Sequence, residues 1–114
     1  MAKPPVIDFF DGDTGIARIA FNRPEVLNAI NGPMRDGLNA AWERFRDDQA
    51  AWVAILTGAG RAFCAGGDFG PGSNTGGLSL EEGRQIVDHL LELRKPIVSA
   101  VQGYAMGLGA TSLA

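Results

Sequence analysis

The chain has 114 residues, of which 46% are hydrophobic and 20% charged, with a formal net charge of −3. This length allows one domain with a core and excludes two, and the ordinary composition argues against a disordered chain. Ten basic residues scattered among thirteen acidic ones offer no electrostatic basis for nucleic-acid binding. With no apolar run of membrane-spanning length and one cysteine, the sequence predicts a cytoplasmic protein that has no membrane partner and no disulfide framework.

The first third of the chain predicts a β-hairpin followed by a helix. Two β-prone runs, 6–10 and 16–21, flank a turn rich in aspartate and glycine. The second run ends at Asn22-Arg23-Pro24, because the residue before a proline resists helical angles. A helix opens at Asn31-Gly32-Pro33, where proline suits the first turn. Apolar residues then recur at helical spacing to about residue 49, which predicts one buried helix face.

The middle of the chain combines a buried strand with a long glycine-rich stretch. The near-continuous apolar run 52–57 is typical of a parallel strand covered on both faces. Residues 58–78 follow it, and a connection of that length is usually functional. Within it, residues 70–78 could form a wall of a binding pocket.

A second helix and a third buried strand are predicted in the last third of the chain. Ser79 and Glu82 have the spacing of a capping box, so a helix should begin there. We expect this helix to end before Pro96 and to turn four apolar side chains inward: Ile86, Val87, Leu90 and Leu91. An apolar strand over 96–101, a glycine-rich turn and a short helical run then follow. Strands that alternate with helices predict an α/β fold.

Two glycine-rich junctions, 61–68 and 103–109, each follow a predicted buried strand. Ligands gather at the carboxyl ends of parallel strands, and glycines let a ligand approach the main chain closely. One free backbone N–H from each junction could converge on a single oxygen atom. Such a pair is an oxyanion hole, which stabilises a thioester enolate as charge builds on its carbonyl oxygen.

Three stretches of the sequence resemble motifs of the crotonase superfamily, which includes enoyl-CoA hydratases and isomerases. Residues 22–29 (Asn-Arg-Pro-Glu-Val-Leu-Asn-Ala) resemble its N-R-P-x-x-x-N-A stretch, residues 61–68 its A-F-x-A-G-x-D segment, and residues 103–109 its G-x-x-x-G-x-G segment. Their order and spacing also fit, and the resemblance begins at about Val6. It implies that residues 1–114 form the N-terminal part, about half, of a crotonase-like domain. The implied fold is a ββα-type spiral core with parallel strands and covering helices.

By this resemblance the two oxyanion donors are the backbone N–H groups of Gly67 and Leu108. Leu108 stands where many members have glycine, which keeps the N–H and could narrow the acyl pocket. The resemblance implies an acyl-CoA or enoyl-CoA substrate, no separate cofactor and no metal, because coenzyme A is part of the substrate. The implied substrate-binding residues, with Ala65 near the adenine end, are Ala65, Gly66, Asp68 and Gly107, and on the CoA side Arg23, Leu27 and Ala29.

Thr111 departs from the family pattern. Hydratases of the family use two glutamates as acid and base, and the first of them falls on Thr111. A threonine hydroxyl cannot take up a proton at neutral pH as a carboxylate does. The second glutamate would lie beyond Ala114, so one-base isomerisation of an enoyl-CoA fits better than two-carboxylate hydration. The resemblance also implies a homotrimer or hexamer for a full-length protein.

Two other functions compete with this interpretation. The run 107–112 nearly spells the dinucleotide-binding pattern G-x-G-x-x-G/A, but Ser112 stands at its last position, and a Rossmann unit does not explain the 61–68 junction. A non-catalytic CoA-binding or assembly module of the same fold is the second alternative, favoured by Thr111. For Cys64 and His89, a buried thiol and a partly packed surface histidine are the better interpretations, and Asp68 is more often structural in such a motif than a base.

Overall fold

The computed structural model describes residues 3–68 and 79–114, so the expected pocket wall over 70–78 lies outside the described residues. The elements run in this order: β1 (Val6–Asp11), β2 (Ile16–Phe21), the 3-10 turn η1 (Pro24–Val26), α1 (Gly32–Asp47), β3 (Val53–Gly58), β4 (Ala62–Cys64), α2 (Leu80–Glu92), β5 (Ile97–Ser99), β6 (Tyr104–Ala105) and the π-helical turn η2 (Gly109–Leu113).

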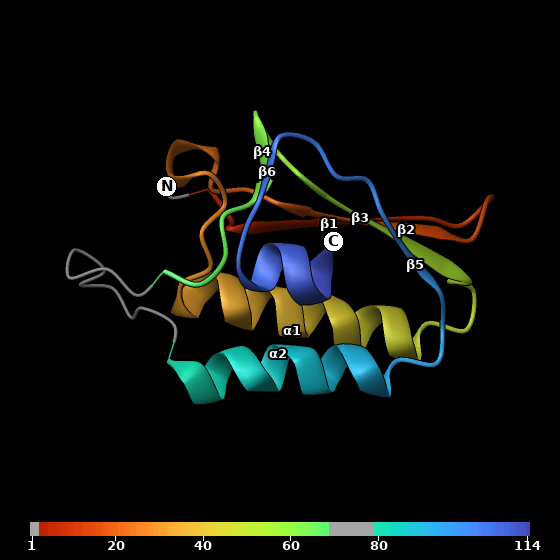
Figure 1. The fold of residues 1–114 in the computed structure, drawn as a ribbon. Coiled ribbons are helices and arrows are strands. Elements are labelled where there is room, and N and C mark those ends of the chain that lie inside the picture. Colours follow the sequence, from red (N-terminus) through yellow and green to blue (C-terminus); the bar gives the residue numbers. More distant parts are fainter. Residues whose placement is uncertain (1–2, 69–78) are drawn as a thin grey trace.

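The strands form two sheets, one large and one small (Figure 1). The large sheet has the order β1-β2-β3-β5, in which β1 and β2 form the antiparallel hairpin and the other pairs are parallel. Strands β4 and β6, which the sequence analysis left inside the glycine-rich junctions, pair in parallel as the small sheet. The predicted α/β layer with a parallel core is therefore confirmed.

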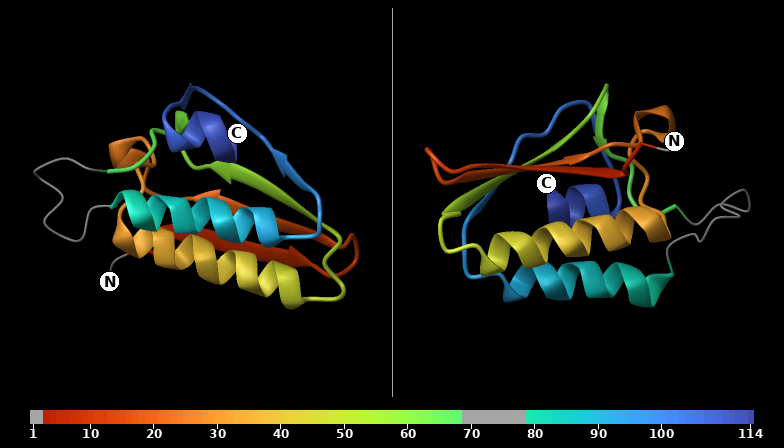
Figure 2. Two further views of the ribbon diagram at one scale, coloured as in Figure 1. Left: turned by 60° about the horizontal axis from the view of Figure 1, so that its bottom comes forward. Right: turned by 180° about the vertical axis from the view of Figure 1, so that it is seen from behind.

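Both long helices lie on the same side of the large sheet, and they run side by side (Figure 2). The core fills the space between them and the sheet, where alternate residues of β2 and β3 meet the apolar stripe of α1. An edge-to-face contact between the rings of Phe21 and Phe63, with centroids 5.5 Å apart, joins the large sheet to β4. The largest fully buried side chains of this core include Phe21, Ile19, Met34, Leu38, Trp42, Leu56 and Phe63.

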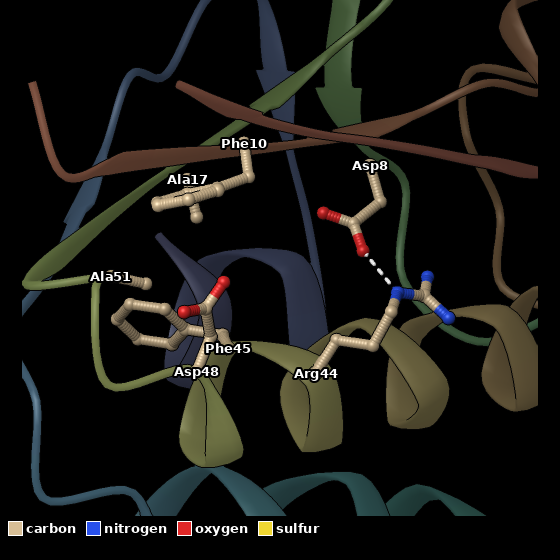
Figure 3. Close-up of a pocket in the computed structure, with 7 residues that line it drawn as sticks. All are labelled: Asp8, Phe10, Ala17, Arg44, Phe45, Asp48 and Ala51. Atoms are coloured by element: carbon tan, nitrogen blue, oxygen red, sulfur yellow. Dashed lines mark hydrogen bonds and ion pairs between the residues drawn. The ribbon is translucent and has the colours of Figure 1, made fainter. Parts of the chain in front are cut away.

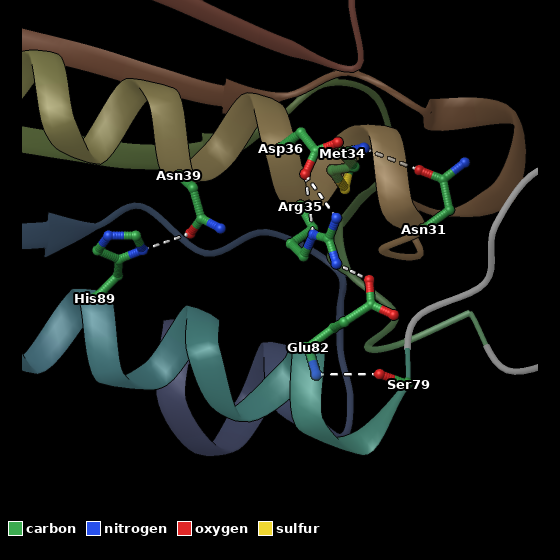
Figure 4. Close-up of polar contacts among 8 residues, drawn as sticks. All are labelled: Asn31, Met34, Arg35, Asp36, Asn39, Ser79, Glu82 and His89. Carbon is green, nitrogen blue, oxygen red and sulfur yellow. Dashed lines mark hydrogen bonds and ion pairs between the residues drawn. The ribbon is translucent and has the colours of Figure 1, made fainter.

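Polar side chains fix both helix starts and tie the helices together (Figure 4). The Asn31 side chain accepts from the N–H of Met34 at 3.0 Å, and the Ser79 hydroxyl accepts from the N–H of Glu82 at 3.1 Å, so both predicted starts are confirmed. The Glu82 carboxylate pairs with Arg35 of α1, so this side chain connects the two helices.

The predicted inward face of α2 is correct for Ile86 and wrong for Leu91. Ile86 is fully buried and Leu90 packs partly against the core, but Leu91 is 76% exposed. At roughly 100° per residue, Leu91 lies about 140° around the helix from Ile86, outside the stripe that faces α1.

Among the described helices, none is both long enough and apolar enough to span a membrane.

Candidate active site

The second half of the first glycine-rich junction (residues 61–68) is held by hydrogen bonds to residues 27–30. The N–H of Ala65 donates to the carbonyl of Leu27 at 3.0 Å. Ile30 forms a parallel bridge with Gly67, in which its N–H donates to Gly66 and its carbonyl accepts from Asp68, each at 2.8 Å. In such a bridge the bonded groups belong to the residues on either side, so the N–H of Gly67 points away from Ile30. Within the described residues, this N–H has no acceptor.

The fully buried side chain of Asn28 holds the start of this junction through hydrogen bonds. The Asn28 amide donates to the carbonyls of Ala59 and Ala62 at 3.0 and 2.9 Å, and its oxygen accepts from the N–H of Arg23 at 2.8 Å. Asn28 adopts a left-handed backbone angle, with φ of 58°, which asparagine tolerates better than most residues. Its side chain therefore connects η1 to both ends of the β3–β4 connection.

The second junction ends in η2, and it leaves the N–H of Leu108 at the start of a helical turn. Leu108 is the N-cap residue just before η2 and has helical backbone angles, with φ of −58°. The carbonyl of Gly107 accepts from the N–H groups of Ala110 and Thr111 at 3.0 and 2.9 Å. The first N–H groups of a helix have no acceptor within it, and the N–H of Leu108 has none anywhere in ranges 3–68 and 79–114.

The two junctions touch each other through their main chains. The N–H of Met106 donates to the carbonyl of Cys64 at 3.0 Å. A Cβ atom added to Gly66 would lie 2.8 Å from the carbonyl oxygen of Met106 and 3.5 Å from the amide nitrogen of Leu108. Glycine at position 66 therefore permits the close approach of the first junction to the main chain of Met106, Gly107 and Leu108.

Gly67 and Leu108 both line one cavity of about 390 Å³. One wall is made by the junctions themselves, and it contains six of the residues predicted for the site: Ala65, Gly66, Gly67, Gly107, Leu108 and Thr111. The other wall comes from α2, through Leu80, Gly83, Arg84 and Val87. None of these α2 residues was among those predicted for the site, and of the four only Val87 was predicted to face inward. Their spacing of three and four residues is the signal that could have indicated a second helix face.

The structure does not bring the predicted CoA-side residues Arg23, Leu27 and Ala29 to this cavity. The Arg23 guanidinium donates to the carbonyl of Ala29 and lies 3.7 Å from the Asp68 carboxylate. The Arg23 guanidinium, through Asp68, and the Leu27 carbonyl, through Ala65, thus contact the first junction itself. The ion pair agrees with the structural interpretation of Asp68, and contact of these residues with CoA stays a prediction.

Groups that could move a proton are scarce at the cavity. The Thr111 hydroxyl donates to the carbonyl of Gly107 at 3.0 Å, so its hydrogen is engaged by the helix backbone. No carboxylate within the described part of the chain lines the cavity.

Burial raises the pKa of the Cys64 thiol, although a hydrogen bond from Gly66 acts in the opposite direction. Cys64 is fully buried, so it is a neutral core thiol as expected.

A second cavity, of about 220 Å³, lies between the hairpin and the end of α1 (Figure 3). Its charged groups already have partners, since Arg44 pairs with Asp8 at 2.6 Å and the Asp48 carboxylate accepts from the N–H of Ala50 at 3.0 Å. None of the residues predicted for the site lines it. We therefore place the candidate site at the larger cavity.

The fold and this site define an α/β protein with two glycine-rich junctions that meet at one pocket. Comparison with known proteins identifies the group. The sequence profile described as enoyl-CoA hydratase/isomerase matches residues 11–114, and the chain belongs to this family. The match leaves the dinucleotide-binding alternative without support.

Relatives and solved structures agree with this assignment. The chain is 43% identical over 101 residues to a Rhodobacter capsulatus protein named "Probable enoyl-CoA hydratase", covering 84% of this chain and 38% of the relative. It is 37% identical to the 1,2-epoxyphenylacetyl-CoA isomerase of Escherichia coli, covering 87% and 41%. An enoyl-CoA hydratase/isomerase structure from Mycobacterium paratuberculosis superimposes with a TM-score of 0.78 at 38% identity, covering 97% of this chain and 46% of that one. The chain thus spans less than half the length of these relatives, and its crotonase-like fold is confirmed.

Proposed function

We propose that this chain carries the oxyanion-binding part of an acyl-CoA enzyme, which isomerises or hydrates the double bond of an enoyl-CoA. The observation that supports the proposal is that Gly67 and Leu108 line the same cavity and that the backbone N–H of each has no acceptor among the described residues. A thioester carbonyl oxygen placed between them would accept two hydrogen bonds. Loss of one such donor typically lowers the rate by about 100- to 1000-fold.

The two amides would act when a proton leaves the carbon next to the thioester or conjugated with it. The electrons of the broken C–H bond then pass towards the carbonyl oxygen, and the enolate charge that develops there is stabilised by the two fixed N–H dipoles. Because these dipoles are already oriented by the Ile30 bridge and by the start of η2, no reorganisation is needed as the charge forms.

Isomerisation is the reaction that we favour over hydration. Hydration with a carboxylate acid–base pair needs two carboxyl groups at the cavity, whereas moving a double bond needs one group that takes a proton from one carbon and returns it to another. The Thr111 hydroxyl already donates to a backbone carbonyl, and no described residue that lines the cavity has a carboxylate. Both observations favour isomerisation, which needs one proton-transferring group rather than two. The relatives carry names of both reaction types. Assembly as a trimer or hexamer remains part of this proposal.

A non-catalytic CoA-binding module remains a second candidate, and the observation at Thr111 favours it. In that case the two amides would still bind the thioester, but no enoyl-CoA would be converted.

Infrared difference spectroscopy of a bound acyl-CoA tests the oxyanion hole directly. We expect the thioester carbonyl stretch to move to lower frequency on binding, because two N–H donors polarise the bond. Leu108→Pro removes one donor at a residue whose φ of −58° suits proline. It should lose a large part of the shift, whereas Leu108→Ala keeps the N–H and should retain it. An unshifted carbonyl in the unaltered protein, or equal shifts in both variants with their circular dichroism unchanged, would refute the proposal.

A further inference from the structure

The candidate cavity has one charged side chain among its described lining residues, Arg84. The rest of the lining consists of glycines, small or aliphatic side chains and the engaged Thr111. Arg84 lies in α2, on the wall opposite the two junction amides, and shares a helix face with Leu80 and Val87 at spacings of four and three residues. Arg84, whose side chain is 75% exposed, thus brings a cationic side chain to a described lining that is otherwise uncharged.

The guanidinium of Arg84 is only weakly engaged by its own helix. Its ion-pair partner is Asp88, one turn on, at 3.9 Å, and the two side chains are 75% and 58% exposed. Pairs this long and this exposed add little to stability. Arg35 of α1 offers a contrast, because it contacts Asp36 at 2.8 Å and also pairs with Glu82. The donors of Arg84 therefore remain available to a ligand in the cavity.

The size of the cavity indicates which part of a substrate would meet Arg84. At about 390 Å³, it lies at the lower end of small-molecule sites, which suits an acyl group better than a whole acyl-CoA. An acyl group whose carbonyl oxygen rests at the amides of Gly67 and Leu108 would extend across the cavity towards α2. An anionic group on that acyl chain would then reach the guanidinium, whose planar donors match a carboxylate.

We propose that Arg84 determines substrate specificity by binding a carboxylate carried by the acyl group. The preferred ligands would then be dicarboxylic acyl thioesters of CoA rather than uncharged ones. This inference rests on the proposed function, since it places the thioester at the junction amides. The oxyanion hole alone would bind any acyl thioester, whereas Arg84 would select those whose acyl group carries a carboxylate.

Titration calorimetry with saturated acyl-CoAs tests the inference without any turnover. Each dicarboxylic thioester is paired with an uncharged one of equal carbon number: succinyl with butyryl, glutaryl with valeryl and adipyl with hexanoyl. We expect the protein to bind the charged member of at least one pair about tenfold more tightly. Arg84→Gln should abolish this preference and leave the uncharged affinity within about twofold, and added salt should weaken the preference in the unaltered protein.

Arg94→Gln is the matched control, because Arg94 is exposed just beyond α2 and does not line the cavity. It should keep the full preference. Equal weakening of both members of a pair by Arg84→Gln would instead place Arg84 at a phosphate of CoA and overturn the inference. A protein that binds acyl-CoAs but shows no preference in any pair would also overturn it, leaving the proposed function intact. Failure of the folded protein to bind any acyl-CoA would refute the proposed function itself.

Discussion

The two glycine-rich junctions present the same chemical group but are built differently. At residues 61–68, groups distant in sequence do the positioning: the Ile30 bridge holds Gly67, and the buried amide of Asn28 bonds the carbonyls of Ala62 and the preceding Ala59. At residues 103–109, glycines allow the main chain to press directly against the first junction. Among the described residues, an N–H without an acceptor therefore arises once at the parallel bridge, on Gly67, and once at a helix start, on Leu108.

This difference has a consequence for sensitivity to mutation. The first junction should depend on one polar side chain, because Asn28 satisfies a buried and a part-buried carbonyl at once. The second should depend on the absence of side chains at Gly103 and Gly109, because a Cβ atom added at either would collide with main-chain atoms. The variants that follow separate the two dependences.

Gly103→Ala should have the largest effect on stability. Gly103 has φ of 62°, and an added Cβ would overlap the carbonyl oxygen of Arg61, so the variant suffers both backbone strain and collision with main chain. We expect a loss of about 3–5 kcal/mol in the free energy of unfolding, measured by urea denaturation. Gly12→Ala is the control, since its nearest contact would be a ring atom of Phe10 at 3.9 Å. Similar stability for the two variants would contradict close packing at the second junction.

Asn28→Ala should have the next largest effect. At a fully buried position, it leaves the N–H of Arg23 without its acceptor and removes the 2.9 Å donor to the carbonyl of Ala62, which keeps a long contact from Gln102 at 3.5 Å, and this should cost about 2–3 kcal/mol. Asn39→Ala is the comparison, because the half-buried Asn39 side chain contacts only His89 at 3.1 Å among the described residues. Its loss should stay under about 1 kcal/mol. Equal urea midpoints for the two variants would show that Asn28 does not support the first junction.

Thr111→Val should have the smallest effect. Its hydroxyl lies on an exposed residue and donates to a carbonyl that already accepts two N–H groups. We expect stability within about 0.5 kcal/mol of the unaltered protein and an unchanged carbonyl shift of bound acyl-CoA. A reduced shift would instead mean that this hydroxyl helps to orient the thioester, and that the second junction depends on a side chain after all.

Local signals in the sequence were enough to predict the two long helices and the strands of the large sheet, but not β4, β6 or η1. Proline in the first turn located α1, the serine cap located α2, and the alternation and apolar runs located β1, β2 and β3. These features act within a few residues of one another, so they can be recognised without knowing the fold. The two junctions were also predicted, because clustered glycines have few uses in a compact domain.

Contacts between distant segments decided the rest. The role of Asn28 depends on carbonyls 31 and 34 residues away, and the exposure of Leu91 depends on where α1 packs against α2. The α2 wall of the cavity, including Arg84, exists only because that helix returns alongside the junctions. Spacing along a chain specifies which residues share a helix face, whereas the partner of that face follows from how the layers assemble.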